Sequence, residues 1–322
     1  MSKPKVCIMV PIEDDLRAQI DAVCETTEIP YASSREEQLA AVKEVDGVLL
    51  TPRVRADDEF FSAGPNLKVI STTSVGYDPF DIPAATKHGV VVCHTPGVLT
   101  DAVANLTMAM VLALAQKLFE HEPYVRSGGW ARREKPSALG MDVQGRTLGI
   151  VGFGRIGQEV TRRMQTIGMK TIWYDVFDTP HPDAPKSEYR PLDDLLAESD
   201  FVSLHMNLNE TSHHMMSTDA FSKMKSTAYL VNTARGGLVD QVALTEALQS
   251  GEIAGAALDV LEAEPPAEDD PIVTLPNVIC FPHIGTATNE TRRLMRELAV
   301  TNLLAVLHGE RPPAPVNPEV LG

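Results

Sequence analysis

The sequence predicts an α/β protein with two Rossmann-like domains, each a doubly wound parallel sheet wrapped by helices. Three observations lead to this class. The chain has 322 residues, enough for two hydrophobic cores. Short apolar runs alternate with amphipathic stretches in two separate series, a pattern that favours parallel strands joined by helices. A glycine-rich turn joins an apolar run to an amphipathic run where the second series begins.

The first hundred residues carry the first series. The runs VCIMV, GVLL, LKVISTT and VVVC are typical of buried strands, and the stretches around Leu16–Val23, Gln38–Val45 and Ile82–His88 are typical of helices between them. One long helix is expected from about Asp101 to Glu120. Its sequence is apolar on most sides, so we expect it to be buried.

The second series begins at the glycine-rich turn. Its expected strands are TLGIVG, KTIWYD, FVSLH, YLVN, AALDV and VICF, and a helix from about Asn289 to His308 follows them. The last helix is expected to return to the first series. We therefore expect residues 101–290 to form one domain, inserted into another that is made of residues 1–100 and 291–322.

The glycine-rich turn has the spacing of a dinucleotide site. Gly152 permits a tight turn, Gly154 lets the backbone approach a pyrophosphate, and Gly157 allows a helix to pack closely on a strand. Asp175 follows the next apolar run, eighteen residues after Gly157, where a carboxylate can accept hydrogen bonds from a ribose diol. The alternative is a glycine-rich turn that binds nothing, but the whole pattern favours a bound dinucleotide.

Composition argues against several other classes of function. The net charge of −16, with no block of clustered Lys and Arg, disfavours a nucleic-acid surface. The sequence shows no signal-peptide core, and the apolar stretch from Leu106 to Leu114 is too short to cross a bilayer. We expect a cytoplasmic protein with no membrane partner and no metal site. Reduced and mostly buried thiols are expected at the four separated cysteines, Cys7, Cys24, Cys93 and Cys280.

Three polar residues follow three successive strands of the second series. They are Arg235 after YLVNTA, Glu264 after AALDVLEA and His283 after VICFP. Ligands of an open parallel sheet bind outside the carboxyl ends of its strands, so these side chains are expected to face one crevice. An arginine can bind a carboxylate with two parallel hydrogen bonds, a histidine can transfer a proton near neutrality, and a glutamate can orient it. Taken singly, each could be an ordinary loop residue; together they suit reduction of a 2-oxo acid.

Four segments are similar, in combination, to one enzyme family: VGFGRIGQ, VNTARGGLVDQVAL, ALDVLEAEPP and FPHIGTAT. On these motifs the chain resembles the D-isomer-specific 2-hydroxyacid dehydrogenases over essentially its whole length. The resemblance implies a flavodoxin-like substrate-binding domain (1–100 and 291–322), an NAD-binding Rossmann domain (101–290), an active site in the cleft between them, and a homodimer. It also implies Arg235 as the ligand of the substrate carboxylate, His283 as acid/base and Glu264 as its partner.

Two further segments, SVGYDPFD and TPGVLTDAVANLTMAM, look most like glyoxylate/hydroxypyruvate reductases. The resemblance implies reduction of a small 2-oxo acid to the D-2-hydroxy acid, with the backbone N–H groups of Val75 and Gly76 holding the carboxylate. The other positions that it implies lie near the nicotinamide (Thr107, Thr233 and Asp259) and near the pyrophosphate (Arg155 and Ile156).

Some positions depart from the family pattern and leave the substrate preference open. Asn207 stands where proline is common, Asn105 stands where glutamate is frequent, and no further tryptophan follows Trp130 in the segment ARREKPSALG. Asp175 and Asp178 have no cation between them. Because a carboxylate there would repel the 2′-phosphate of NADP(H), we expect NAD(H) to be preferred.

Two alternatives remain open from the sequence. The first is D-3-phosphoglycerate dehydrogenase or another D-2-hydroxyacid dehydrogenase, for which Arg53 and Arg55 could contribute to a phosphate site. The second is a non-catalytic, NAD-sensing protein like the corepressors that share this fold. The chain has no low-complexity extension that would suggest such a scaffold role.

Overall fold

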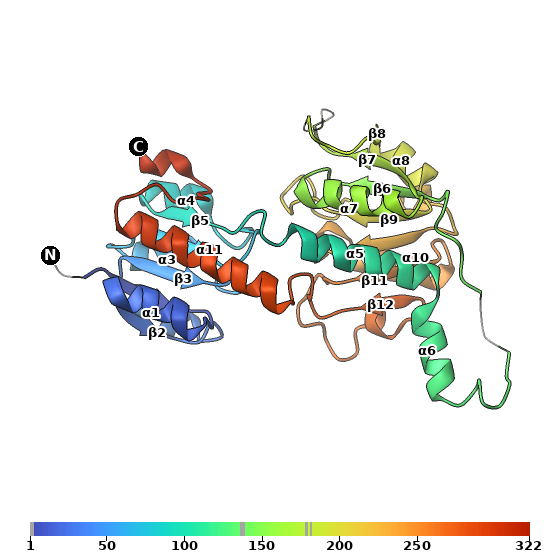
Figure 1. The fold of residues 1–322 in the computed structure, drawn as a ribbon, viewed down its shortest axis with the longest axis horizontal. Coiled ribbons are helices and arrows are strands. Elements are labelled where there is room, and N and C mark those ends of the chain that lie inside the picture. The colour runs from blue at the N-terminus through green and yellow to red at the C-terminus, as the bar shows by residue number, and fades with distance from the viewer. Residues whose placement is uncertain (1–2, 136–138, 178–179, 181) are drawn as a thin grey trace. The chain divides into compact units, whose positions relative to one another are not determined.

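The computed structural model describes residues 3–135, 139–177, 180 and 182–322 (Figure 1). Its contacts divide the chain into two compact units. Unit 1 comprises Met1–Leu99 and Thr288–Gly322, and unit 2 comprises Thr100–Ala287. Both units are parallel sheets with helices, so the predicted α/β class with two parallel sheets is confirmed.

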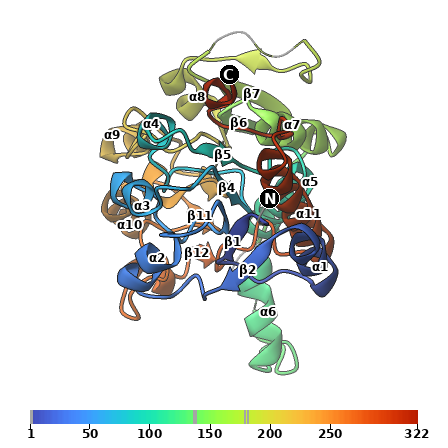
Figure 2. The same ribbon diagram turned by 90° about the vertical axis from the view of Figure 1, so that its left-hand side faces the viewer.

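Unit 1 contains a five-stranded sheet in the order β2-β1-β3-β4-β5, and all of its neighbouring strands are parallel. Helices α1 and α11 cover one face of the sheet, and α2, α3 and α4 cover the other (Figure 2). The elements are β1 (Lys5–Ile8), α1 (Asp14–Val23), β2 (Glu25–Glu28), α2 (Arg35–Ala41), β3 (Gly47–Leu50), α3 (Asp58–Ala63), β4 (Val69–Thr72), α4 (Ile82–Lys87), β5 (Val91–Cys93), α11 (Asn289–Leu307) and the short helix η3 (Pro318–Leu321).

Helix α11 completes the core of unit 1. Leu303 of α11 packs on Gly47 of β3 so closely that an added Cβ at Gly47 would lie 2.9 Å from its Cδ1. Ser71 of β4 donates a hydrogen bond from its Oγ to the carbonyl oxygen of Ala299, at 2.8 Å. A helix encoded more than two hundred residues after β4 therefore closes this sheet.

Unit 2 contains a seven-stranded parallel sheet in the order β12-β11-β10-β9-β6-β7-β8. Helices α5 and α7 cover one face (Figure 1), and α8, α9 and α10 pack on the other. The elements are α5 (Thr100–Ala115), α6 (Leu118–Arg126), β6 (Thr147–Val151), α7 (Arg155–Thr166), β7 (Lys170–Tyr174), β8 (Glu188–Tyr189), α8 (Leu192–Glu198), β9 (Phe201–Leu204), α9 (Thr218–Lys223), β10 (Tyr229–Asn232), η1 (Gly236–Leu238), α10 (Gln241–Ser250), β11 (Gly255–Leu258), η2 (Pro271–Thr274) and β12 (Val278–Cys280).

The expected single helix from Asp101 to Glu120 is wrong in one respect. It is divided into α5 and α6, which meet at an angle of 66°. Lys117 adopts a left-handed backbone conformation, with φ of 54°, and so interrupts the helical hydrogen-bond pattern. α5 is largely buried, as expected, whereas none of the described residues of α6 is buried and the helix projects away from the sheet (Figure 1).

Two further expectations concern the state of the cysteines and the presence of a membrane-spanning helix. Among the described residues all four cysteines are free thiols, and burial raises the pKa of Cys93 to about 12 and that of Cys280 to about 11. In the described part of the chain, no single helix is long and apolar enough to span a membrane. The bent pair of α5 and α6 meets that criterion by length and composition alone.

Candidate active site

The glycine-rich turn connects β6 to α7 at the carboxyl end of the sheet of unit 2. Gly152 has φ of 98°, and an added Cβ there would lie 2.5 Å from the backbone carbon of His205. A Cβ at Gly157 would lie 2.2 Å from the carbonyl oxygen of Gly152. Both glycines are therefore required by the packing of the turn itself.

Gly154 is different, because an added Cβ would meet no described atom within 4 Å. It is the N-cap of α7, whose first two residues are Arg155 and Ile156. The open space lies where the N–H groups of the first helical turn can receive an anion. Packing within the described residues does not require a glycine at this position, and the open space would admit a ligand close to the backbone. These residues therefore fit the pyrophosphate of a dinucleotide.

Asp175 lies directly after β7 and already has two backbone partners. Its Oδ2 accepts a hydrogen bond from the N–H of Phe153 at 2.7 Å, and its Oδ1 accepts one from the N–H of Val176 at 2.7 Å. Asp175 thus fastens the glycine-rich turn to the next strand, a role that the sequence did not predict. Each carboxylate oxygen keeps a lone pair for a ribose hydroxyl. Asp178 lies outside the described residues.

His283 and Glu264 form a hydrogen-bonded pair at the carboxyl ends of β12 and β11. The His283 Nδ1 and the Glu264 Oε2 are 2.8 Å apart, and Glu264 Oε1 accepts a hydrogen bond from the N–H of Leu261 at 3.2 Å. Burial raises the pKa of Glu264, but its hydrogen bond with His283 and the attraction of the imidazolium form outweigh that effect and lower the pKa overall. An ionised carboxylate can only accept, so Nδ1 carries the shared proton and Nε2 faces away from this pair.

Asp259 positions the loop that carries His283. It is 1% exposed, and its Oδ1 and Oδ2 accept hydrogen bonds from the N–H groups of Ile284 (2.7 Å) and Gly285 (2.8 Å). The N–H of His283 also donates to the carbonyl oxygen of Asp259 at 2.9 Å. Burial raises the pKa of Asp259, although the two backbone N–H groups oppose this shift. His283 has φ of 56°, so the loop that holds it turns sharply.

Arg235 follows β10, the neighbour of β11. Asn232 fixes its backbone, because the Asn232 side chain donates to the carbonyl oxygen of Arg235 at 2.9 Å and accepts from the N–H of Ala234 at 3.0 Å. The positive charge of Arg235 contributes to lowering the pKa of Glu264. The structure thus brings Arg235, Glu264 and His283 to the ends of three adjacent strands of one sheet.

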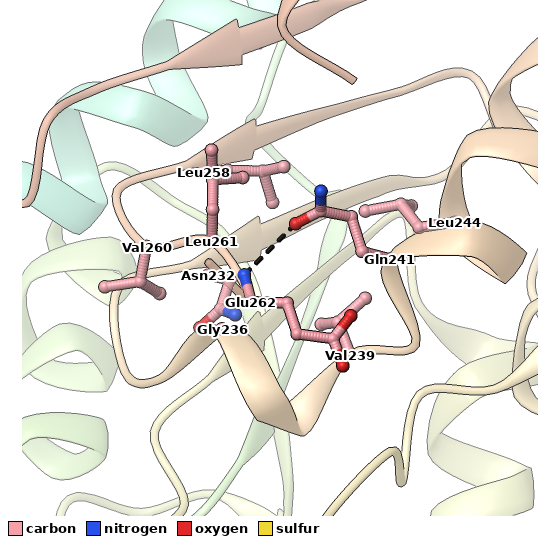
Figure 3. Close-up of a pocket in the computed structure, with 9 residues that line it drawn as sticks. All are labelled: Asn232, Gly236, Val239, Gln241, Leu244, Leu258, Val260, Leu261 and Glu262. Atoms are coloured by element: carbon pink, nitrogen blue, oxygen red, sulfur yellow. Dashed lines mark hydrogen bonds between the residues drawn. The ribbon is translucent and has the colours of Figure 1, made fainter. Parts of the chain in front are cut away.

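The loops after β10 and β11 are in close contact beside Arg235. A Cβ at Gly236 would lie 1.9 Å from the carbonyl oxygen of Leu261, so only glycine fits there. A small pocket beneath this contact is lined by residues of both loops and of α10 (Figure 3). There the Gln241 Oε1 accepts a hydrogen bond from the N–H of Glu262 at 3.1 Å (Figure 3).

Thr107 and Thr233, both in unit 2, are joined by a hydrogen bond between their hydroxyl groups. Their hydroxyl oxygens are 3.0 Å apart, and the Thr107 hydroxyl also donates to the carbonyl oxygen of Val103 at 2.9 Å. Thr107 comes from α5 and Thr233 from the loop after β10, two residues before Arg235. Both threonines are therefore next to the loop that holds Arg235.

Val75 and Gly76 lie in unit 1, in the loop after β4. The carbonyl oxygens of the loop are occupied: Ser74 accepts from the N–H of Thr95 at 2.8 Å, Val75 accepts from the His94 Nδ1 at 2.9 Å, and Gly76 accepts from the Ser74 hydroxyl. In contrast, no hydrogen bond within the described chain uses the N–H of Val75 or of Gly76. These two N–H groups are available to an anion.

Ser74 and His94 were not predicted as site residues. His94 follows β5 directly, and β5 is the neighbour of β4, so the carboxyl ends of the two strands lie at one edge of the sheet. The rule that selected Arg235 and His283, a polar residue within three positions of the end of a strand, would also have selected His94.

Comparisons with known proteins show the family to which the chain belongs. Residues 108–285 match the model of the D-isomer specific 2-hydroxyacid dehydrogenase, NAD binding domain. The chain is 43% identical to glyoxylate reductase of Thermofilum pendens, over 100% of this chain and 96% of that one, and 46% identical to glyoxylate reductase of Korarchaeum cryptofilum, over 89% and 87%. The chain belongs to the D-isomer-specific 2-hydroxyacid dehydrogenases. The family predicted from the motifs is therefore confirmed, as is the prediction of an NAD-dependent dehydrogenase.

Solved structures of this dehydrogenase family agree with the fold. A glyoxylate reductase from Paecilomyes thermophila has a TM-score of 0.90 at 30% identity, covering 99% of this chain and 100% of that one. An NADPH-dependent glyoxylate/hydroxypyruvate reductase from Sinorhizobium meliloti, in complex with NADP and malonate, has a TM-score of 0.86 at 29% identity, covering 98% and 97%. Structural relatives of this dehydrogenase thus include one that uses the phosphorylated cofactor.

Proposed function

We propose that this dehydrogenase reduces glyoxylate, hydroxypyruvate or a similar small 2-oxo acid to the D-2-hydroxy acid, with NADH as the reductant. The observation that supports this best is the His283–Glu264 pair beside Arg235, at the ends of adjacent strands. The names of the similar reductases supply the substrate class. In this proposal residues 101–290 bind the cofactor, and residues 1–100 and 291–322 bind the substrate.

In the proposed mechanism, three groups hold the substrate carboxylate. Arg235 donates two parallel hydrogen bonds to it, and the N–H groups of Val75 and Gly76 complete its coordination. The nicotinamide, when bound, supplies the hydride that the carbonyl carbon receives. Thr107, Thr233 and Asp259 are proposed to lie near that ring.

His283 is proposed to donate the proton. Since the His283 Nδ1 is hydrogen-bonded to Glu264, its Nε2 carries the proton that passes to the carbonyl oxygen of the substrate. The imidazole ring becomes neutral as the hydroxyl group of the product forms. The Glu264 carboxylate stabilises the charged ring before transfer and holds its orientation. In the reverse reaction the neutral Nε2 accepts the hydroxyl proton.

Purified protein tests the proposal directly. We expect NADH absorbance to fall on addition of glyoxylate or hydroxypyruvate, and chiral analysis to find the D product. Arg235→Ala should mainly raise KM, because it removes a carboxylate ligand, whereas His283→Ala should mainly lower kcat. Near-normal turnover by His283→Ala would exclude it as the proton donor, and no oxidation of NADH with any 2-oxo acid would refute the function.

The cofactor preference is a separate part of the proposal. Asp175 would accept hydrogen bonds from the ribose diol of NADH and repel the 2′-phosphate of NADPH by roughly 1–4 kcal/mol. Side-by-side kinetics with the two cofactors measure this preference. Equal or better turnover with NADPH would refute it, and the NADPH-dependent relative shows that the comparison is needed.

The D-3-phosphoglycerate alternative depends on Arg53 and Arg55. Arg55 is paired with Asp57 at 3.1 Å, and Arg53 lies over the ring of Tyr31, with 5.3 Å from its Cζ to the ring centroid. Both guanidinium groups thus have partners within unit 1, which gives this alternative no specific support. Including 3-phosphohydroxypyruvate among the tested substrates resolves it.

We further propose that the enzyme is a cytoplasmic homodimer. The support for a second copy is α6 and the segment after it, where several apolar side chains are at least half exposed or nearly so. They are Leu118, Phe119, Val125 and Trp130. The molar mass in solution, measured by light scattering after gel filtration, tests the assembly, and the mass of a single chain would refute it.

A further inference from the structure

The loops after β9 and β11 hold a second cluster of chemically active side chains. It comprises His213, His214 and Glu262, whose ring nitrogens and carboxylate oxygen can all lie within 4.8 Å of one another. The reaction proposed above uses none of them. We propose that these three side chains form a binding site for a divalent transition-metal ion of the zinc type.

The backbone of the loop brings two consecutive histidines to one side. Consecutive side chains of an extended chain point in opposite directions, but His214 has φ of 53°, in the left-handed region. As a result the two imidazole rings stack, with their centroids 3.8 Å apart and their planes 23° apart. A left-handed conformation is uncommon for a residue other than glycine and is often retained where it serves a site.

The loop is also held in place on both sides of the pair. The N–H of His213 donates to the carbonyl oxygen of Asn209 at 2.9 Å, and the N–H of His214 donates to that of Gly237 at 2.9 Å. Asn209 in turn accepts hydrogen bonds from the N–H groups of Thr211 and Ser212 through its side chain. The backbone that carries the two histidines is therefore held in place before any ion binds.

Glu262 completes the cluster from the neighbouring loop. Its Oε1 is 2.6 Å from the His214 Nε2. Its backbone N–H is fixed by Gln241 (Figure 3). The Gln241 side chain also donates to the Asp270 carboxylate at 2.7 Å. Both ligand-bearing loops are thus anchored through backbone and side-chain hydrogen bonds, which limits the entropy lost when an ion binds.

The donor set determines which ion fits. Two imidazoles and one carboxylate suit Zn²⁺, Ni²⁺ or Cu²⁺ and leave a position for water, whereas Ca²⁺ and Mg²⁺ require more oxygen ligands. A plain His214–Glu262 ion pair would account for one ring only. A metal ion takes neutral imidazole. The net charge of −16 also attracts cations to this protein.

A bound ion would connect the loops of the proposed active site. Glu262 lies two residues before Glu264. A Cβ at Gly237, two residues after Arg235, would be 3.7 Å from the His213 Cδ2. An ion here is separate from the hydride transfer and would act by stiffening these loops. The metal site itself does not depend on the proposed substrate or on catalysis.

Metal titration of the chelator-treated full-length protein tests the site. With Zn²⁺ measured by calorimetry, we expect one equivalent to bind, and with Co²⁺ we expect visible absorption bands of imidazole coordination. Glu262→Gln and His213→Gln should each weaken the binding of Zn²⁺ at least about tenfold, which is about 1.4 kcal/mol. The matched control His308→Gln changes an exposed histidine on the other unit and should bind as the unaltered protein does.

Two results would overturn the proposal. One is no saturable Zn²⁺ binding by the unaltered protein. The other is binding that survives Glu262→Gln and His213→Gln but is lost in His283→Gln, which would place the ion on the His283–Glu264 pair. Circular dichroism of each variant confirms that it is folded, and the titration reads binding directly, so the result stands whether or not glyoxylate is reduced.

Discussion

Replacing Asp259 by Asn tests how the loop of His283 is held. The carboxylate accepts one N–H on each oxygen, from Ile284 at 2.7 Å and from Gly285 at 2.8 Å, at a site 1% exposed. Asn has a single acceptor oxygen, so one N–H loses a charge-assisted bond and faces an NH₂ group instead. Leaving this buried donor without its charged partner costs roughly 1–3 kcal/mol. Removing the buried charge offsets part of that cost, which leaves about 1–2 kcal/mol.

In a folding unit of the size of unit 2, such a loss lowers the melting temperature by about 2–8 °C. Both tryptophans, Trp130 and Trp173, belong to unit 2, and Trp173 is buried, so fluorescence melting follows the unit that contains Asp259. The matched control is Asp240→Asn at the N-cap of α10, where Asn caps as well as Asp and the change should stay within about 0.5 kcal/mol. If Asp259→Asn melts within about 1 °C of the unaltered protein, the two hydrogen bonds do not hold the loop.

The pH dependence of the same variant follows from the raised pKa of Asp259. The unfolded chain ionises near the ordinary value of 3.8, before the folded protein does. Stability from this group is therefore complete below pH 3.8 and falls as the pH rises through the higher folded value. Asp259→Asn should lack this decline. We expect the difference in melting temperature between the variant and the unaltered protein to be largest at the acidic end of that window.

Three further predictions concern the cofactor and the acid/base pair. Gly157→Ala places its Cβ against the carbonyl oxygen of Gly152 and should destabilise the protein by about 1–3 kcal/mol. Gly154→Ala should melt at the normal temperature but bind NADH at least about tenfold more weakly in a fluorescence titration. Normal NADH affinity in Gly154→Ala would show that no ligand approaches this position. Glu264→Gln should lower kcat about tenfold. Because the pKa of Glu264 is lowered in the folded protein, the variant should also lose stability that the unaltered protein has above pH 4.5 and loses as the pH falls through the pKa of folded Glu264. Unchanged kinetics and an unchanged acid melting profile would show that Glu264 is not the partner of His283. Asp175→Ser should shift the kcat/KM ratio at least about tenfold towards NADPH. An unchanged ratio would leave Asp175 only its hydrogen bonds with the N–H groups of Phe153 and Val176.

The strands and the site residues differ in how well the sequence predicted them. Buried parallel strands such as GVLL are continuous apolar runs and were predicted, whereas β2 has the polar sequence ETTE and was missed. β2 lies at the edge of the sheet, where no second neighbour buries its side chains. The break between α5 and α6 was also missed, because a left-handed Lys117 leaves no mark in the hydrophobic pattern.

Among the site residues, position after a strand was the useful signal. It identified Arg235, Glu264 and His283, which the structure brings together within unit 2. It could not reveal that Asp259 holds the loop of His283. That role depends on the backbone N–H groups of Ile284 and Gly285, about 25 residues later in the chain. Partners that come from distant segments become visible only in three dimensions.

The return of α11 to unit 1 has a consequence for synthesis of the chain. The segment that begins at residue 288 is synthesised after unit 2, yet it supplies Ala299 and Leu303 to the interior of the first sheet. Unit 2 is continuous and can fold while translation proceeds, since domains generally fold as units. Until α11 has been synthesised, the face of the first sheet on which it packs stays exposed to water. Molecular chaperones can bind such an exposed apolar face during that time.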